Sequence, residues 1–191
     1  MAKKLFYSLA ESIQKRFEEN PNWYTEHFHF WDAPPPTELA KLRAAASQPL
    51  ISCECCGGPI KCYKRKLTST AAAIMCFLYS TNYRPGQKQY DLPWTHKSKI
   101  PREFVHGGEI AQLKHWNLME EKLNDDSGKR TSGIWRLTQR GVVFVRGGCK
   151  VPSHIFVQSP RNKLLGFEET KTDIETALGN RFNYEELMQG I

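Results

Sequence analysis

The first twenty residues carry apolar side chains at every fourth position, a spacing that predicts an amphipathic helix. In "KKLFYSLAESIQKRFEENP" the apolar face consists of Leu5, Leu9, Ile13 and Phe17. The helix ends at Asn20, because the residue before a proline avoids helical geometry. Its glutamates oppose adsorption on anionic lipid, so we expect it to dock on the protein's own core or on a second copy, as in a homodimer.

The segment after this helix is aromatic and ends in three prolines. "NWYTEHFHFWDAPPP" predicts an irregular arm with a stiff polyproline end, followed by a helix over "TELAKLRAAAS". His27 and His29 alternate with Phe28 and Phe30, which places both imidazoles on one face of an extended chain. These histidines are either ordinary packing residues or ligands for a metal ion.

Helical and strand periodicities then alternate up to residue 148. "LTSTAAAIMCFLYS" predicts a helix capped by Thr68 or Ser69. Its apolar stripe comprises Leu67, Ala71, Ile74, Met75 and Leu78. "PREFVHGGEIAQLKHW" predicts a short helix, a glycine turn and a second helix with Ile110 and Leu113 facing inward. "NLMEEKL" and "GIWRL" predict two strands around a polar turn, and "TQRGVVFVRGG" predicts a capped helical turn.

The C-terminal residues predict a hairpin and two helices. "VPSHIFVQSPRNKLLGFEET" contains two strands joined at "SPRN", and "TDIETALGNRFNYEELM" contains a helix that stops at Gly179 before a short closing helix. We expect this tail to cap the core or to provide a self-association surface. Cys76 and Trp116 are expected to be buried core residues.

The run "GGEIAQLKHWNLMEEKLNDDSGKRTSGIWRLTQRGVVFV" resembles the recognition helix, wing and following helix of a winged helix-turn-helix domain. The similarity extends over about residues 64–148, and the whole chain resembles small phage or prophage proteins that join a cysteine knuckle to such a domain. The resemblance implies an α+β fold with a winged helix-turn-helix core, N-terminal helices, a zinc-type cysteine knuckle and a C-terminal β-hairpin plus helix.

Four parts follow from these predictions. Residues 1–50 form N-terminal helices and the aromatic arm, and residues 51–66 the cysteine knuckle and a basic strand. Residues 67–150 form the winged-helix domain, and residues 151–191 the C-terminal hairpin and helix.

The net charge is +7, and residues 61–150 contain 17 Lys and Arg against seven Asp and Glu, whereas both flanks are slightly acidic. Such a basic block indicates a polyanionic partner; the alternative is a solvated lysine-rich face.

In a winged helix, the third helix enters the major groove of DNA and the wing contacts phosphate or the minor groove. The resemblance therefore implies a set of nucleic-acid contacts within the basic block. These are Lys64, Arg65, Lys66, Lys97, Lys99, Arg102, Gln112, Lys114, His115, Lys129 and Arg130. Glu109 begins the third helix and no arginine lies on its exposed face, so we expect contact with the DNA backbone or its shape more than base-specific reading.

A cysteine cluster, "CECCGGPIKC", precedes the basic strand. Cys53 and Cys56 have the Cys-x-x-Cys spacing of a metal knuckle, and the glycines that follow tolerate the tight turn that this knuckle requires. Cys62 and His29 are our candidates for the remaining ligands of a zinc ion. Other donors are Cys55, His27, Cys149 and His154, and the alternatives to zinc are a knuckle shape without metal and a redox or disulfide role.

No stretch has the 18 to 20 apolar residues of a membrane span, and the N-terminus lacks a cleavage-type signal, so we expect a cytoplasmic protein with no membrane partner.

The leading hypothesis is a non-enzymatic nucleic-acid-binding protein of phage type. The alternative is a protein-binding module, such as a phage-encoded inhibitor or modulator of a host nucleic-acid enzyme or defence system. No phosphate-binding loop, metalloprotease motif or nucleophile elbow favours an enzyme.

Overall fold

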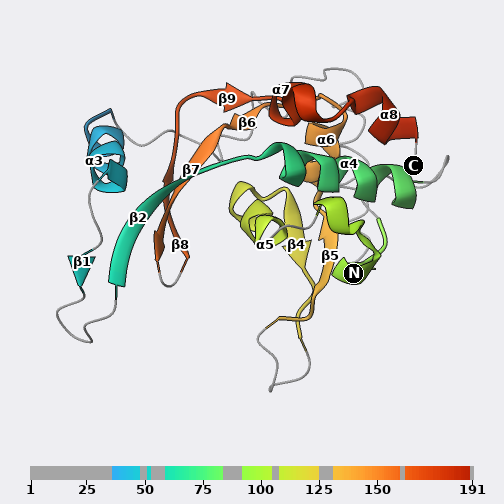
Figure 1. Cartoon of the computed structure of the whole chain (residues 1–191), viewed down its shortest axis with the longest axis horizontal. Helices are drawn as coiled ribbons and strands as arrows, with labels where there is room; N and C mark the ends of the chain where they lie inside the picture. The colour runs from blue at the N-terminus through green and yellow to red at the C-terminus, as the bar shows by residue number, and fades with distance from the viewer. Residues whose placement is uncertain are drawn as a thin grey trace, which may run out of the picture.

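The computed structural model describes residues 36–47, 51–52, 59–83, 92–104, 108–124, 131–159 and 162–189. Within these ranges, helices and mainly antiparallel sheets are mixed, which confirms the α+β class (Figure 1). None of the helices in the described part of the chain combines the length and apolarity that crossing a bilayer requires.

The helix α4 (Ser69–Asn82) lies at the centre of the main core. Thr68 caps it, because its side chain accepts a hydrogen bond from the backbone N–H of Ala71. Cys76 is buried as expected, but the expectation of a single apolar stripe was too narrow, since Ala72 and Ala73 are also fully buried. The reason is tertiary: α4 contacts the helices α5 (Glu109–Leu113), α6 (Gln139–Val145), α7 (Ile174–Leu178) and α8 (Tyr184–Gln189).

A three-stranded antiparallel sheet packs beside α4. It contains β3 (Thr95–His96), β4 (Met119–Glu121) and β5 (Ile134–Leu137), in the order β3-β5-β4. Two 3-10 helices, η1 (Lys97–Lys99) and η2 (Arg102–Phe104), connect β3 to α5. The helix expected after the glycine turn is short: α5 passes into the 3-10 helix η3 (Lys114–Trp116), which ends at Asn117 in the left-handed region, φ 53°.

A second antiparallel sheet has the order β1-β2-β7-β8, formed by β1 (Ile51–Ser52), β2 (Pro59–Lys66), β7 (His154–Ser159) and β8 (Lys163–Phe167). The predicted C-terminal hairpin is thereby confirmed. Its first strand pairs with the basic strand β2 from Lys61↔Ser159 to Lys66↔His154. The predicted helix α3 (Pro36–Ser47) covers one face of this sheet, where Leu39, Cys62 and Phe156 form a small apolar cluster.

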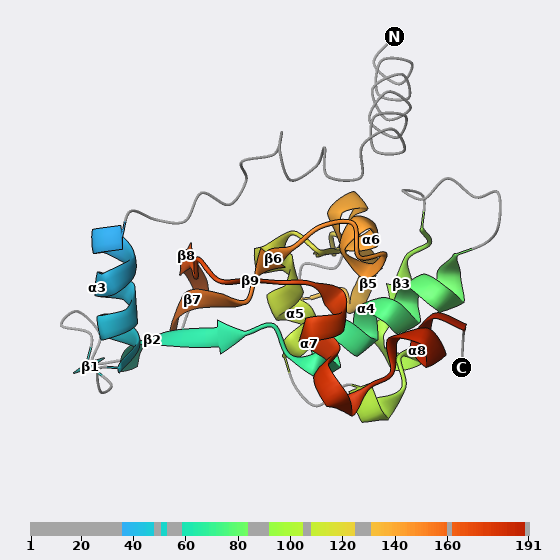
Figure 2. The same ribbon diagram turned by 90° about the horizontal axis from the view of Figure 1, so that it is seen from above.

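The C-terminal residues return to the core through a two-stranded sheet of β6 (Val151–Pro152) and β9 (Lys171–Thr172). Figure 2 shows β9 leading into α7, which lies against α4. Asp173 caps α7 by accepting from the N–H of Thr176, and Gly179 ends it with φ 59° before η4 (Gly179–Arg181). Leu178 and Leu187 are buried, so the tail caps the core as expected.

Close packing between α6 and the residue that precedes β4 requires a glycine. A Cβ atom on Gly141 would overlap the carbonyl oxygen of Leu118. That oxygen accepts a hydrogen bond from the backbone N–H of Thr138, the residue that caps α6, so it has little freedom to move. The backbone of α6 at Gly141 therefore lies directly against the backbone of Leu118, just before β4.

Gly141→Ala is therefore expected to lower the free energy of unfolding by about 3 kcal/mol, as overpacking against a fixed backbone does. Urea denaturation followed by circular dichroism measures this. Gly108→Ala is the matched control, because a Cβ at Gly108 meets no atom within 4 Å and the change should cost little. Equal stability of the two variants would contradict the packing described.

Candidate nucleic-acid interface

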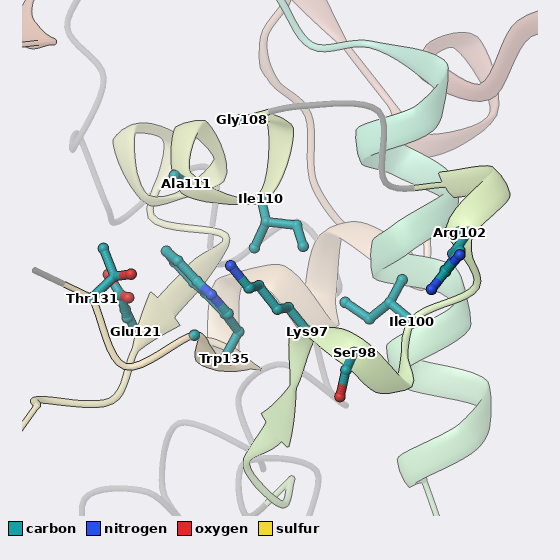
Figure 3. A pocket seen from close by; sticks show the side chains of 11 residues that line it. Lys97, Ser98, Ile100, Arg102, Gly108, Ile110, Ala111, Glu121, Thr131 and Trp135 are labelled. Carbon is teal, nitrogen blue, oxygen red and sulfur yellow. The ribbon is translucent and has the colours of Figure 1, made fainter. Parts of the chain in front are cut away.

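A groove of about 820 Å³ lies between η1, the start of α5 and the β4–β5 hairpin. Lys97 and Arg102, two of the cations predicted to contact nucleic acid, both line it. Figure 3 shows Lys97 crossing the groove beside Trp135, with Arg102 at one end and Glu121 near the other. Ile110 from α5 forms an apolar part of the wall. The groove thus combines two cations, one carboxylate and flat apolar surfaces.

Backbone contacts hold Lys97 in this position. Its N–H donates to the carbonyl oxygen of Gly133 at 2.9 Å, which ties η1 to the start of β5. The ring of His96 caps η1, since Nδ1 accepts from the N–H of Ser98 at 3.2 Å. Gly133 has φ 70°, and a Cβ there would lie 3.3 Å from His96 Nε2, so a glycine suits both the backbone geometry and the close approach. Lys99, also a candidate, is exposed in the same 3-10 helix.

The helical candidates differ in their accessibility. Lys114 is exposed, whereas Gln112 and His115 are half-buried. The sequence predicts that His115 projects freely, and this is wrong. Its Nε2 lies 3.1 Å from the side-chain amide of Asn162 in the β7–β8 turn. Burial, and secondarily the charge of Lys114, lower the pKa of His115, which favours the neutral imidazole. Trp116 is a core residue as expected, and its Nε1 donates to the carbonyl oxygen of Pro152 at 2.6 Å.

Because His115 contacts Asn162, Lys163 belongs to the same surface, and the sequence did not indicate this cation. Lys163 follows Asn162 and is exposed, and Lys114 precedes His115, so these two lysines flank one hydrogen-bonded pair. They are 49 positions apart in the chain. No local pattern could have revealed this, because the pair forms only when the β7–β8 hairpin folds back toward η3.

Trp94 is 36% exposed and lies beneath a cation. The guanidinium of Arg136 is 4.4 Å from the centre of the indole ring. Arg136 Nε also donates to Glu120 Oε1 at 2.5 Å, across the β4–β5 ladder. One face of Trp94 is therefore already occupied within the molecule.

The cations of β2 lie on two faces of its sheet. Lys61 and Arg65 lie over the ring of Tyr63, at 5.4 and 4.7 Å from its centre. Lys66 is exposed at the end of the strand. Lys64 points to the other face, toward α3, where it meets an acidic residue. Side chains that are adjacent in the sequence are separated here because successive positions of a strand alternate between faces.

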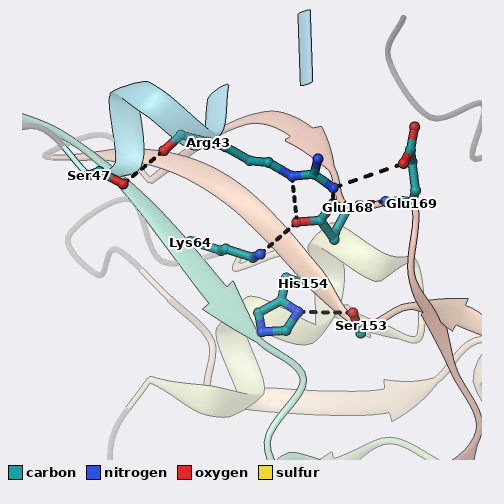
Figure 4. Close-up of polar contacts among 7 residues, drawn as sticks. All are labelled: Arg43, Ser47, Lys64, Ser153, His154, Glu168 and Glu169. Carbon is teal, nitrogen blue, oxygen red and sulfur yellow. Dashed lines mark hydrogen bonds and ion pairs between the residues drawn. The ribbon is translucent and has the colours of Figure 1, made fainter. Parts of the chain in front are cut away.

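Lys64 forms an ion pair with Glu168, whose carboxylate Oε2 lies 2.6 Å from the lysine Nζ (Figure 4). Arg43 from α3 pairs with the same carboxylate through its guanidinium. Glu168 is 4% exposed, and its pKa is lowered to about 2, first by the hydrogen bond from Arg43 and then by Lys64, against the cost of burial. The cluster joins α3 to the sheet and neutralises much of the charge of Lys64.

Glu168→Gln is expected to lower the free energy of unfolding by about 2 kcal/mol at pH 7. The value is modest because Arg43 and Lys64 are half-exposed and solvent screens them. Glu168 titrates at about 2 in the folded chain against an ordinary 4.5, so its contribution is complete above about pH 5 and is lost as the pH falls toward 2.

Urea unfolding of the two proteins between pH 7 and pH 2 measures this contribution. The stability difference should shrink as the pH falls, and a difference that stays constant would contradict the role of the ionised carboxylate. Glu169→Gln is the control, because that half-exposed carboxylate lies 3.9 Å from Arg43 and its loss should cost less than about 0.5 kcal/mol.

Cys62, a candidate zinc ligand, lies in the apolar cluster with Leu39 and Phe156. Burial raises the pKa of its thiol, which disfavours the thiolate form that binds metals. Cys76 and Cys149 are also buried, with pKa values raised by burial to about 12 and about 11. Within the described ranges, no three His, Cys, Asp or Glu side chains are placed to share a metal ion. The other zinc candidates, Cys53, Cys56 and His29, lie outside those ranges.

Substitution at Cys62 distinguishes a packing role from a ligand role. Packing predicts that Cys62→Ala is more stable than Cys62→Ser, because serine places a hydroxyl group in an apolar cluster. A ligand role predicts that both variants lose bound zinc alike, together with Cys53→Ser and Cys56→Ser. Elemental analysis and thermal unfolding of the four variants give the answer; loss of zinc in Cys62→Ala would contradict the packing role.

Of the predicted wing tip, Lys129 and Arg130 also lie outside the described residues. The groove, the lysines flanking His115 and Asn162, and the β2 cations are thus the places where the candidate nucleic-acid residues are found. No family model, curated protein or solved structure matches this chain.

Proposed function

We propose that the protein is a non-enzymatic nucleic-acid-binding protein that contacts the phosphate backbone through the groove between η1, α5 and the β4–β5 hairpin. The observation that carries this proposal is the convergence of Lys97 and Arg102 in one groove. Both were candidates on sequence grounds, and neither has an acidic side chain within ion-pair distance in the described part of the chain. Such cations bind phosphate largely independently of sequence.

The order of elements supports the winged helix-turn-helix interpretation of this region. After α4 come β3, the short helices η1 and η2, then α5, η3, β4 and β5; apart from the added β3, this is the sequence of helices followed by two strands that the resemblance implies. The strands β4 and β5 pair antiparallel beside α5, as the two strands of a wing would. Zinc at Cys53 and Cys56 stays a prediction and is not needed for the groove.

Insertion of α5 into the major groove is the weaker part of the analogy. Five helical residues span only about 7.5 Å. The β7–β8 turn also lies against η3 through Asn162 and His115, which narrows the space beside the helix. We therefore favour contact with the backbone, and with unpaired stretches of a strand, over the reading of a base sequence in duplex DNA.

Charge reversal in the groove tests the proposal. Lys97→Glu/Arg102→Glu is expected to weaken binding of single-stranded and duplex DNA at least tenfold at low salt, for all sequences alike. It should also reduce the slope of log affinity against log salt by about 1 to 2, because up to two phosphate contacts are lost. Fluorescence anisotropy over a salt series measures both quantities.

The control is Arg146→Glu/Lys171→Glu, which changes the net charge equally. These residues are exposed at the end of α6 and in β9, elements that do not line the groove. The control should retain most of the affinity. Equal losses in both double variants would show that net charge alone governs binding, and failure of the native protein to bind any DNA or RNA would favour the protein-binding alternative.

A further inference from the structure

The groove contains a carboxylate oxygen without a hydrogen-bond partner. Glu121 Oε1 is buried, and no donor of the described chain reaches it, although Glu121 lines the groove at the end of β4. Buried polar atoms in folded proteins nearly always have a partner, so an oxygen that no described donor reaches is a place where a ligand donor can bind. A ligand with N–H groups directed at this end of the groove would supply it.

The rest of the groove complements a flat ring that carries an anionic group. Ile100, Ile110 and Trp135 provide apolar walls. Arg102 provides positive charge at the end away from Glu121, and the Lys97 ammonium lies between the two, beside Trp135 (Figure 3). Its volume of about 820 Å³ is within the usual range of small-ligand sites. An acceptor at one end, apolar walls, one cation at the other end and a second cation between them match a nucleotide, whose base has polar edges and whose phosphate is anionic.

We propose that the groove binds an unpaired guanine nucleotide. The Glu121 carboxylate accepts hydrogen bonds from the base, Arg102 binds its phosphate, and Lys97 lies along the nucleotide between them. The inference rests on the proposed function and names the ligand of the same groove. Guanine has two adjacent donors, N1–H and N2–H, on its Watson–Crick edge, and a carboxylate accepts both.

The other bases fit a carboxylate less well. Thymine and uracil place their single N–H between two carbonyl oxygens, which repel a carboxylate. Adenine and cytosine place a ring-nitrogen acceptor beside the amino group, so the second carboxylate oxygen meets a lone pair. The donor edge of guanine is occupied by cytosine in a duplex, so the base must be unpaired to reach Glu121.

Two pairs of probes test this on the full chain. Guanosine 5′-monophosphate is compared with uridine 5′-monophosphate by calorimetry, and a thymidine oligonucleotide with one central guanine is compared with an all-thymidine oligonucleotide of the same length by anisotropy. The native protein should prefer guanine about tenfold in each pair. Glu121→Gln should reduce this preference to about threefold or less, while affinity for the all-thymidine strand stays equal or rises, because a negative charge has been removed.

Glu120→Gln is the matched control. Glu120 is the neighbouring residue of β4, it pairs with Arg136, and it does not line the groove, so this variant should keep the full preference for guanine. Glu121→Asp keeps the charge but withdraws the carboxylate by one methylene, so it should also lose preference. Thermal unfolding identifies any variant that fails to fold, and the preference of the native protein tests the proposal without any variant.

The outcomes separate the two proposals. Equal binding of both oligonucleotides by the native protein, or a Glu121→Gln variant that binds both strands more tightly with an unchanged preference, would overturn the guanine assignment but leave nucleic-acid binding in place. A chain that prefers guanosine monophosphate yet binds neither strand would retain the pocket assignment and overturn the proposed function.

Discussion

The burial of α4 at every position from Thr70 to Cys76 is the constraint on which the structure depends. Ala71, Ala72 and Ala73 present little side-chain volume, so neighbouring helices can approach its backbone closely. The elements next to α4 in the sequence do not cover this buried stretch by themselves. The chain meets this requirement by returning at its C-terminal end, where the pairing of β6 with β9 leads α7 and α8 onto α4.

The same return shapes the candidate site. The β7–β8 hairpin that precedes β9 pairs with β2 and reaches η3 through the contact of Asn162 with His115. On the other side of α5, the hydrogen bond from Lys97 to Gly133 ties η1 to β5. The segment from α5 to η3 is therefore held between the β7–β8 hairpin and the β4–β5 hairpin. The groove opens on the β4–β5 side, where Lys97 and Arg102 lie with Glu121.

Charge along the chain is a poor measure of charge available to a ligand in this protein. Lys64 belongs to the most basic run of the sequence, yet Glu168 pairs with it from more than one hundred positions away. Lys97 and Arg102 lie in a less concentrated region but share the groove. The difference arises because a cation contributes to binding only when no carboxylate of the same molecule already balances it.

The sequence by itself determined the local elements. The helices α3 and α4, a cap at Thr68 or Ser69, the strands β4 and β5, the C-terminal hairpin and the stop at Gly179 all follow from periodicity, caps and turn residues. It also identified Lys97 and Arg102 as candidates. Only the tertiary structure decided that α4 is buried at every position from Thr70 to Cys76, that β2 pairs with β7, that Cys62 packs against Leu39, and that Glu121 lines the groove. Periodicity and capping act within a few residues, whereas these contacts join segments that are distant along the chain, and their partners are set by which surfaces the whole fold brings together.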